Sequence, residues 1–158
     1  MVLLAGCASY SGSGLVPGRS SAAEVEALMG APALRLALPG GGEEWYYPRG
    51  GRMGWDTYAV GIGPDGVMRA IEQRRTVENV ARLEPGVATM KDAQALLGPP
   101  FEVTRFPRMK RTDWGYRIHE APRWWIFWLQ FSDDGVLREV IKLPDFEREG
   151  EAPFAGLH

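Results

Sequence analysis

The sequence has few residues suited to covalent or metal chemistry. It contains one cysteine, Cys7, and two histidines, His119 and His158. A single cysteine excludes an intrachain disulfide, so packing alone must hold the fold together. No histidine, cysteine or carboxylate cluster has the spacing of metal ligands. Asp133 and Asp134 precede a glycine, which a hairpin turn explains better than acid–base catalysis does. We therefore expect no metal, no cofactor, no small-molecule substrate and no enzymatic activity.

The sequence also lacks long apolar runs and a strong net charge. No run approaches the roughly 20 apolar residues that a membrane-spanning helix needs. The net charge of −2 gives a weak overall field, so nucleic acid is not an expected partner and a protein is. The hydrophobic content of 45% lies outside the range of disordered chains. The chain should therefore fold, as one ordinary domain or as two very small ones.

An internal repeat is present in the spacing of short motifs. Residues 15–18 (Leu-Val-Pro-Gly) recur at 83–86 (Leu-Glu-Pro-Gly), and a Gly-x-Pro triplet at 30–32 recurs at 98–100, a displacement of 68 positions. Between these motifs, Ser21 precedes Glu24 and Thr89 precedes Asp92 by three residues, which is the capping-box spacing. The glycine of each triplet stands where a left-handed residue ends a helix. Each copy is therefore predicted to begin with a short helix.

Strand patterns follow each predicted helix, now displaced by 69 positions. Alternating large apolar residues at 58–62 recur at 127–131, and Asp-Gly at 65–66 recurs at 134–135. Alternation is typical of a half-buried strand, and Asp-Gly predicts a two-residue type I′ hairpin. Closing strands are expected over 67–74 and 136–143. Residues that recur at fixed positions are assigned to the core: Trp45, Tyr47, Trp114 and Tyr116.

These patterns predict an α+β fold built from two tandem repeats, each a helix followed by a meander of three or four antiparallel strands, with helices packed on one face of the sheet. Four segments follow: 1–14 as a flexible tether, 15–75 as the first repeat, 76–143 as the second, and 144–158 as a charged, disordered tail. A short helix is expected over 76–82, before the helix of the second repeat.

The residues around the cysteine suggest a lipid anchor. Leu4-Ala5-Gly6-Cys7 resembles the bacterial lipobox, in which the cysteine is acylated before a signal peptidase cleaves the chain. The small polar residues at 8–14 suit a tether. Residues 1–3 are too short for a signal peptide, so we expect its true start to lie upstream. The alternative is an ordinary N-terminal segment that contains a cysteine.

The order of the motifs resembles the BamE (SmpA/OmlA) family of outer-membrane lipoproteins, here in a tandem form. That order is Leu-x-Pro-Gly, a capped helix ending before Gly-x-Pro, Trp-x-Tyr, and an aromatic strand running into Asp-Gly. Duplication of such a unit is also similar to the β-lactamase inhibitor protein architecture. The first resemblance implies a lipoprotein on the periplasmic side of the outer membrane that assists the β-barrel assembly machinery or envelope maintenance. The second implies a periplasmic protein that inhibits an enzyme.

The aromatic strand at 123–131 is the strongest candidate binding element. If its core residues face the helix, four others face the opposite side: Trp124, Ile126, Trp128 and Gln130. The equivalent positions in the first repeat hold small residues, Thr57, Ala59 and Gly61. Tryptophan is common at interaction hot spots, so we predict a partner-binding surface here. The alternative is that the tail or the other repeat covers these rings.

One basic cluster lies at 105–111, and its cations are Arg105, Arg108, Lys110 and Arg111. On a tethered protein these charges suit contact with lipid head groups. With Trp114 close behind, they also fit a phosphate-binding patch with a stacking ring. The favoured interpretation is a solvated loop between two strands.

Overall fold

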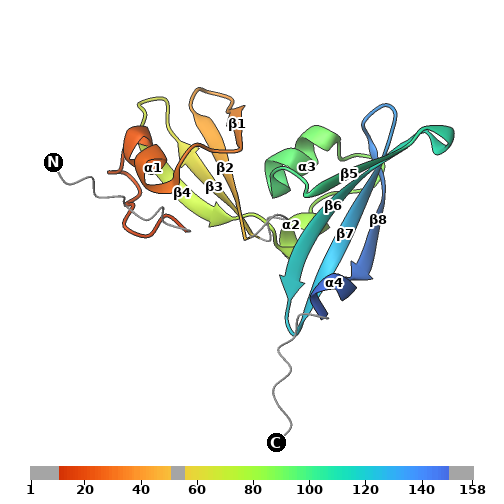
Figure 1. Ribbon diagram of the computed structural model, residues 1–158. Coiled ribbons are helices and arrows are strands. Elements are labelled where there is room, and N and C mark those ends of the chain that lie inside the picture. Colours follow the sequence, from red (N-terminus) through yellow and green to blue (C-terminus); the bar gives the residue numbers. More distant parts are fainter. Residues whose placement is uncertain (1–10, 51–55, 150–158) are drawn as a thin grey trace, which may run out of the picture.

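The computed structural model describes residues 11–50 and 56–149 and has an α+β fold with two four-stranded antiparallel sheets (Figure 1). The first repeat comprises α1 (Ala22–Met29), β1 (Leu34–Ala37), β2 (Glu43–Arg49), β3 (Asp56–Ile62) and β4 (Met68–Gln73). The second comprises α2 (Val77–Ala81), α3 (Met90–Leu97), β5 (Glu102–Phe106), the 3₁₀ turn η2 (Pro107–Met109), β6 (Arg111–Glu120), β7 (Arg123–Ser132) and β8 (Leu137–Pro144). A last helical turn, α4 (Phe146–Glu149), follows. In both sheets the strand order is the chain order, so each sheet is a simple meander.

The predicted helix starts are confirmed at both repeats. Ser21 caps α1 and Thr89 caps α3, and each forms a complete capping box with the carboxylate three residues later, Glu24 or Asp92. The short helix expected over 76–82 is present as α2, capped by Thr76. These local hydrogen bonds satisfy backbone donors that a helix start otherwise leaves unpaired. Sequence alone therefore determines where the helices begin.

Both main helices end at the predicted glycines, but in a different backbone conformation. Gly30 has φ 85° and ψ −173°, and Gly98 has φ 75° and ψ −164°. The positive φ was predicted. The ψ values are extended rather than left-handed helical, and this combination is accessible almost only to glycine. The chain therefore leaves each helix in an extended direction.

The Asp-Gly hairpins are present, although the predicted type I′ turn was wrong. Positive φ occurs at Gly66 (74°) and Gly135 (76°), while among the described non-glycine residues only Lys110 has it. A type I′ turn needs positive φ at both central residues. The amide of Gly66 donates to the carbonyl of Gly63 at 2.9 Å. The amide of Gly63 in turn donates to the carbonyl of Val67 at 2.9 Å. Each loop is therefore three residues long, a tight turn followed by a left-handed glycine.

Each repeat has its own apolar core between its helix and one face of its sheet. The core of the first repeat comprises Val25, Met29, Trp45, Tyr47, Val60, Ile62 and Met68. That of the second comprises Val80, Leu83, Ala88, Ala93, Leu97, Tyr116, Ile118, Phe127, Leu129, Phe131 and Leu137. Trp45, Tyr47 and Tyr116 are buried as predicted, and Trp114 is half-buried against the second core. Residues at equivalent positions of the two repeats therefore pack in the core of each repeat.

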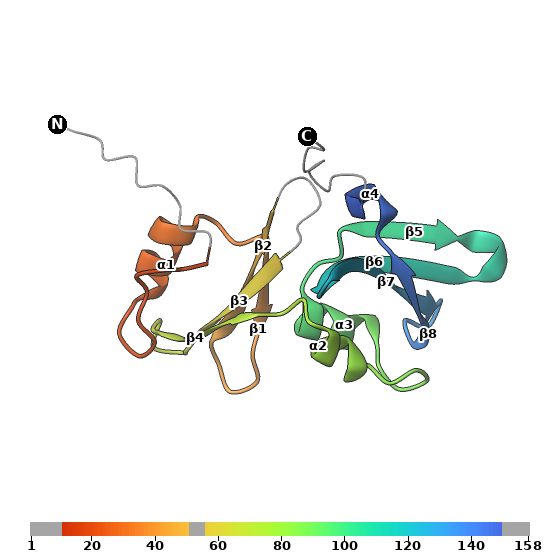
Figure 2. The same ribbon diagram turned by 90° about the horizontal axis from the view of Figure 1, so that it is seen from below.

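The two repeats are joined by α3, which packs on the back of the first sheet. Tyr46, Thr57 and Ala59 lie on that back face and are almost completely buried. The Tyr46 hydroxyl donates to the carbonyl of Ala95 in α3 at 2.7 Å. Figures 1 and 2 show the resulting order of layers: α1, the first sheet, α3 with α2, and the second sheet. The small residues of the first repeat, Thr57 and Ala59, therefore form an internal interface and not an open surface.

Residues at the start of the expected disordered tail are ordered in the structure. Pro144 is the last residue of β8, Asp145 is completely buried, and α4 follows. The remainder of the tail, residues 150–158, lies outside the described residues, as does the lipobox with Cys7.

Candidate functional site

The alternation of β7 places its even-numbered residues on the outer side of the second sheet. Phe127, Leu129 and Phe131 point into the core beneath α2 and α3. Trp124, Ile126, Trp128 and Gln130 therefore face away from the helices, and all four are half-buried. The predicted direction of these side chains is confirmed by the core residues between them. Whether this face binds a partner stays a prediction.

Strand β8 adds two apolar side chains to the same face. Ile141 lies opposite Trp128 and Leu143 opposite Ile126 in the antiparallel ladder. Side chains directly opposite in such a ladder share a face of the sheet, and Leu143 is 47% exposed. We call this surface the aromatic face: Trp124, Ile126, Trp128, Ile141 and Leu143. One side of it borders a shallow hollow of about 320 Å³ that Trp128 shares with Ile141 and Leu143.

The hollow joins the aromatic face to the edge strand β5. Glu102, Thr104 and Phe106 of β5 line it, together with Asp113 of β6. Thr104 and Asp113 lie opposite each other in the ladder. An apolar floor with a polar rim on one side is the usual anatomy of a protein-binding surface.

The position of the Trp128 ring depends on a glycine beneath it. A side-chain carbon at Gly115 would lie 2.9 Å from Trp128 Cζ3 and 2.9 Å from Phe101 Cε1. The Phe101 and Trp128 rings are inclined at 55° with centroids 5.9 Å apart. The absence of a side chain at Gly115 therefore lets both rings settle over the strand. The Trp128 ring is therefore held in place by its neighbours before any contact with another molecule.

A buried ion pair closes one end of the aromatic face. Arg117 on β6 is 4% exposed, and its Nε lies 3.0 Å from Oδ2 of Asp145, which is completely buried. The Arg117 guanidinium also lies 4.7 Å from the Phe101 ring centroid, and the amide of Asp145 donates to the carbonyl of Trp124 at 3.0 Å. The chain after β8 therefore packs against Arg117 and the main chain of Trp124 at this end of the sheet. Whether the tail covers the tryptophan rings stays a prediction. Trp128, Ile141 and Leu143 remain accessible at the hollow.

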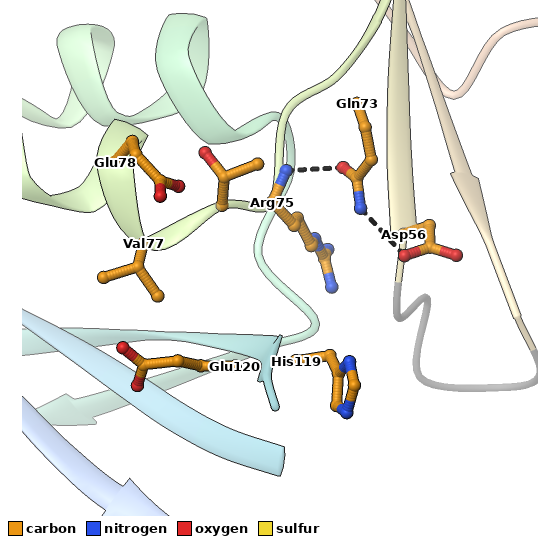
Figure 3. A pocket seen from close by; sticks show the side chains of 8 residues that line it. Asp56, Gln73, Arg75, Val77, Glu78, His119 and Glu120 are labelled. Carbon is orange, nitrogen blue, oxygen red and sulfur yellow. Dashed lines mark hydrogen bonds between the residues drawn. The ribbon is translucent and has the colours of Figure 1, made fainter. Parts of the chain in front are cut away.

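A second cavity, of about 430 Å³, lies where the two repeats meet (Figure 3). Figure 3 shows Asp56 and Gln73 of the first sheet on one side, His119 and Glu120 of β6 on another, and Arg75 between them. Gln73 Nε2 donates to Asp56 at 2.8 Å, and Gln73 Oε1 accepts from the Arg75 amide at 2.6 Å. These contacts connect the first sheet to the segment that leads into the second repeat.

Arg75 fixes that connecting segment against the second repeat. Its Nη2 donates to the carbonyl of Pro99 at 2.8 Å, and its guanidinium lies 5.7 Å from the ring centroid of Tyr116. Burial lowers the pKa of Arg75 to about 10, so the side chain is still a cation at neutral pH. Within residues 11–50 and 56–149, no group of three or more metal-binding side chains exists. We assign this cavity a structural role at the joint between repeats.

The basic cluster occupies the tip of the β5–β6 hairpin. Arg105 belongs to β5, Arg108 to η2 and Arg111 to β6, while Lys110 at the turn has φ 53°. The cluster therefore spans the turn and the adjoining ends of both strands. The segment borders the hollow of the aromatic face through Phe106, and its four cations are not among the residues that line that hollow. No helix in the described part of the chain is long and apolar enough to cross a membrane.

Sequence reasoning missed four contributors to the outer surface. Ile141 and Leu143 were within reach, because the strand expected over 136–143 alternates and pairs with β7. Phe101 and the Arg117–Asp145 pair had no short-range signal, since their contacts join segments about 30 residues apart in the chain. Such pairs are formed by tertiary packing.

No protein-family model matches the chain, and no curated protein matches it in sequence. Among solved structures, it is similar to a DUF4309 family protein (YjgB) from Bacillus subtilis subsp. subtilis str. 168, at 22% identity, over 84% of each chain and with a TM-score of 0.32. A similarity this weak carries no argument about function.

Proposed function

We propose that this chain is a membrane-anchored binding protein of the bacterial envelope, and that its aromatic face contacts a protein partner. The observation that carries the proposal is the contrast between the two sheets. The back of the first sheet is covered by α3, whereas on the corresponding side of the second sheet Trp128, Ile141 and Leu143 line a hollow to which no helix of the described residues contributes. A sheet face that presents a half-buried tryptophan, Trp128, beside the exposed Leu143 fits a protein interface.

The proposed anchor and the proposed partner rest on motifs in the sequence. The anchor rests on the likeness of Leu4-Ala5-Gly6-Cys7 to a lipobox, which would place the protein on the periplasmic side of the outer membrane. The order of motifs in each repeat, similar to that of the BamE family, favours the β-barrel assembly machinery as partner. A soluble periplasmic enzyme is the second candidate, favoured by the duplicated architecture. In both cases the protein acts by binding and not by catalysis.

Site-specific photo-crosslinking in native membranes tests the partner. A photoreactive residue at Leu143 probes the aromatic face, and one at Val87 is the matched control, because Val87 is 67% exposed on a loop of the same repeat. We expect crosslinks to the barrel-assembly complex from position 143 and none from position 87. Capture of a soluble enzyme from position 143 would favour the inhibitor role instead, and equal capture from both positions would reject the aromatic face.

Substitution of the same face tests how much it contributes. We expect Trp128→Ala to weaken binding of the captured partner at least tenfold, in the range of interface hot spots. Because Trp128 also packs on Phe101, Leu143→Arg is the companion variant, since it alters an exposed side chain and leaves the core intact. Val87→Arg is its control. Unchanged affinity for both Trp128→Ala and Leu143→Arg would contradict the proposal.

A further inference from the structure

The turn of the β5–β6 hairpin combines several cations with exposed apolar side chains. We call residues 105–111 (Arg-Phe-Pro-Arg-Met-Lys-Arg) the basic tip. All of its side chains are exposed except that of Arg111, which is half-buried. Figures 1 and 2 show this hairpin, coloured teal, extending past the rest of its sheet at the end of the molecule opposite α1. The basic tip is therefore free to approach a large surface.

Within the described part of the chain, the four cations of the basic tip form no ion pair with a carboxylate. Ion pairs within residues 11–50 and 56–149 involve other cations: Arg35, Arg69, Arg74, Arg117, Arg138 and Lys142. None joins Arg105, Arg108, Lys110 or Arg111 to a described acidic residue, and the basic tip contains no acidic residue itself. On a chain with a net charge of −2, this is a local concentration of uncompensated positive charge.

Apolar side chains lie among these cations. Met109 is 62% exposed and Phe106 39% exposed, and Pro107 between them is exposed as well. Exposed apolar side chains surrounded by arginine and lysine fit the interface of a bilayer, where the apolar groups enter the head-group layer and the cations meet lipid phosphates.

We propose that the basic tip is a membrane-contact site for anionic phospholipids, with Met109 and Phe106 entering the head-group layer and the four cations contacting lipid phosphates. Nucleic acid fits less well. The ring that the sequence offered for base stacking, Trp114, faces the core, where it packs edge-to-face on Phe131 with centroids 5.2 Å apart. The one aromatic ring of the basic tip is Phe106, and the exposed Pro107 and Met109 beside it suit a bilayer interface better than stacked bases. The proposal is independent of the lipid anchor and of the partner of the aromatic face.

Vesicle co-sedimentation of the full chain carrying Cys7→Ser tests the proposal, since this variant cannot be acylated. The vesicles contain either phosphatidylcholine alone or an equimolar mixture with phosphatidylglycerol. We expect binding to the mixed vesicles only, and weaker binding as salt is added. Arg108→Glu with Lys110→Glu should weaken it at least thirtyfold, because each cation near an anionic surface contributes several-fold to affinity. Circular dichroism confirms that each variant is folded.

Two further variants test whether binding depends on the basic tip itself. One tests whether a change of net charge elsewhere has the same effect, and the other whether electrostatic attraction suffices without the apolar side chain. Arg19→Glu with Lys91→Glu makes the same change of charge at exposed positions elsewhere and should leave most of the binding intact. Met109→Ser keeps every cation and should weaken binding several-fold if the side chain enters the bilayer. Equal losses in both double variants, no loss with Met109→Ser, or binding of a single-stranded oligonucleotide in preference to the vesicles would each overturn the proposal.

Discussion

Gly30 and Gly98 show how one residue type serves two purposes at equivalent positions. Both end a helix with positive φ and extended ψ. A side-chain carbon at Gly30 would meet nothing within 4 Å, whereas one at Gly98 would lie 2.7 Å from Thr57 Cγ2 and 3.1 Å from Tyr46 Cδ1. Gly30 is therefore required by the backbone alone, while Gly98 also lets the two repeats approach each other.

This difference gives a prediction with an internal control. Gly30→Ala should lower the free energy of unfolding by about 1–3 kcal/mol, because its backbone conformation is strained for alanine. Gly98→Ala should lower it by a further amount of about 1–3 kcal/mol, because overpacking is added. Urea denaturation of the two variants measures both values. Equal losses would mean that α3 is not in contact with the first sheet at this point.

At the scale of single elements, the capping boxes make the stability of the fold depend on pH. Hydrogen bonds from the Thr89 hydroxyl and the Thr89 amide hold the pKa of Asp92 below its usual value of 3.8. The Ser21 amide and hydroxyl do the same for the pKa of Glu24 in α1. A carboxylate whose pKa is lowered by folding stabilises the fold above its unfolded pKa. That contribution is lost as the pH falls through the folded pKa.

Asp92→Asn should therefore make the free energy of unfolding depend less on pH under acidic conditions. At pH 7 we expect a loss of less than about 1 kcal/mol, because asparagine retains part of the cap. The difference from wild type should shrink as the pH is lowered from about 5 to below the usual pKa of 3.8. Urea midpoints across this range measure the effect. Glu139→Gln removes an exposed carboxylate elsewhere in the repeat, and an identical profile for this variant would contradict a role for the cap.

At the scale of the whole molecule, the helix of one repeat covers the back of the preceding sheet. The Tyr46 hydroxyl marks this joint, because it donates to Ala95 at 2.7 Å and lies 2.9 Å from Oε2 of Glu44. Burial raises the pKa of Tyr46 far above its usual value, so it stays a neutral donor. On the second sheet the equivalent face is the aromatic face, and among the described residues no helix lines the hollow beside Trp128, Ile141 and Leu143. This difference between the two sheets is the basis of the proposed binding surface.

Substitution of Tyr46 should weaken the contact between the two repeats. We expect Tyr46→Phe to lower the free energy of unfolding by about 1 kcal/mol, through loss of one hydrogen bond. Tyr46→Ala should lower it by about 3–5 kcal/mol, through loss of a buried ring. Hydrogen exchange should show the largest increase at the amides of β2, β3 and α3. An increase confined to the first repeat would show that the repeats are not coupled through this contact.

The local features of this protein follow from its sequence, because each depends on residues within a few positions of one another. Helix starts at Ser21 and Thr89, helix ends at Gly30 and Gly98, and the alternation in β7 were all predictable. The duplication was visible because such signals recur at fixed spacing. The turn type was mistaken, since Asp-Gly suits more than one hairpin loop.

Tertiary structure alone decided which surfaces are covered. The strands of both sheets alternate in the same way in the sequence, yet α3 covers Thr57 and Ala59 on the back of the first sheet, while Trp128 and Leu143 on the back of the second sheet line a hollow. The burial of Arg117 with Asp145 likewise depends on how the chain turns after β8. Burial is a property of contacts between segments distant in the chain, whereas capping and alternation are determined by near neighbours.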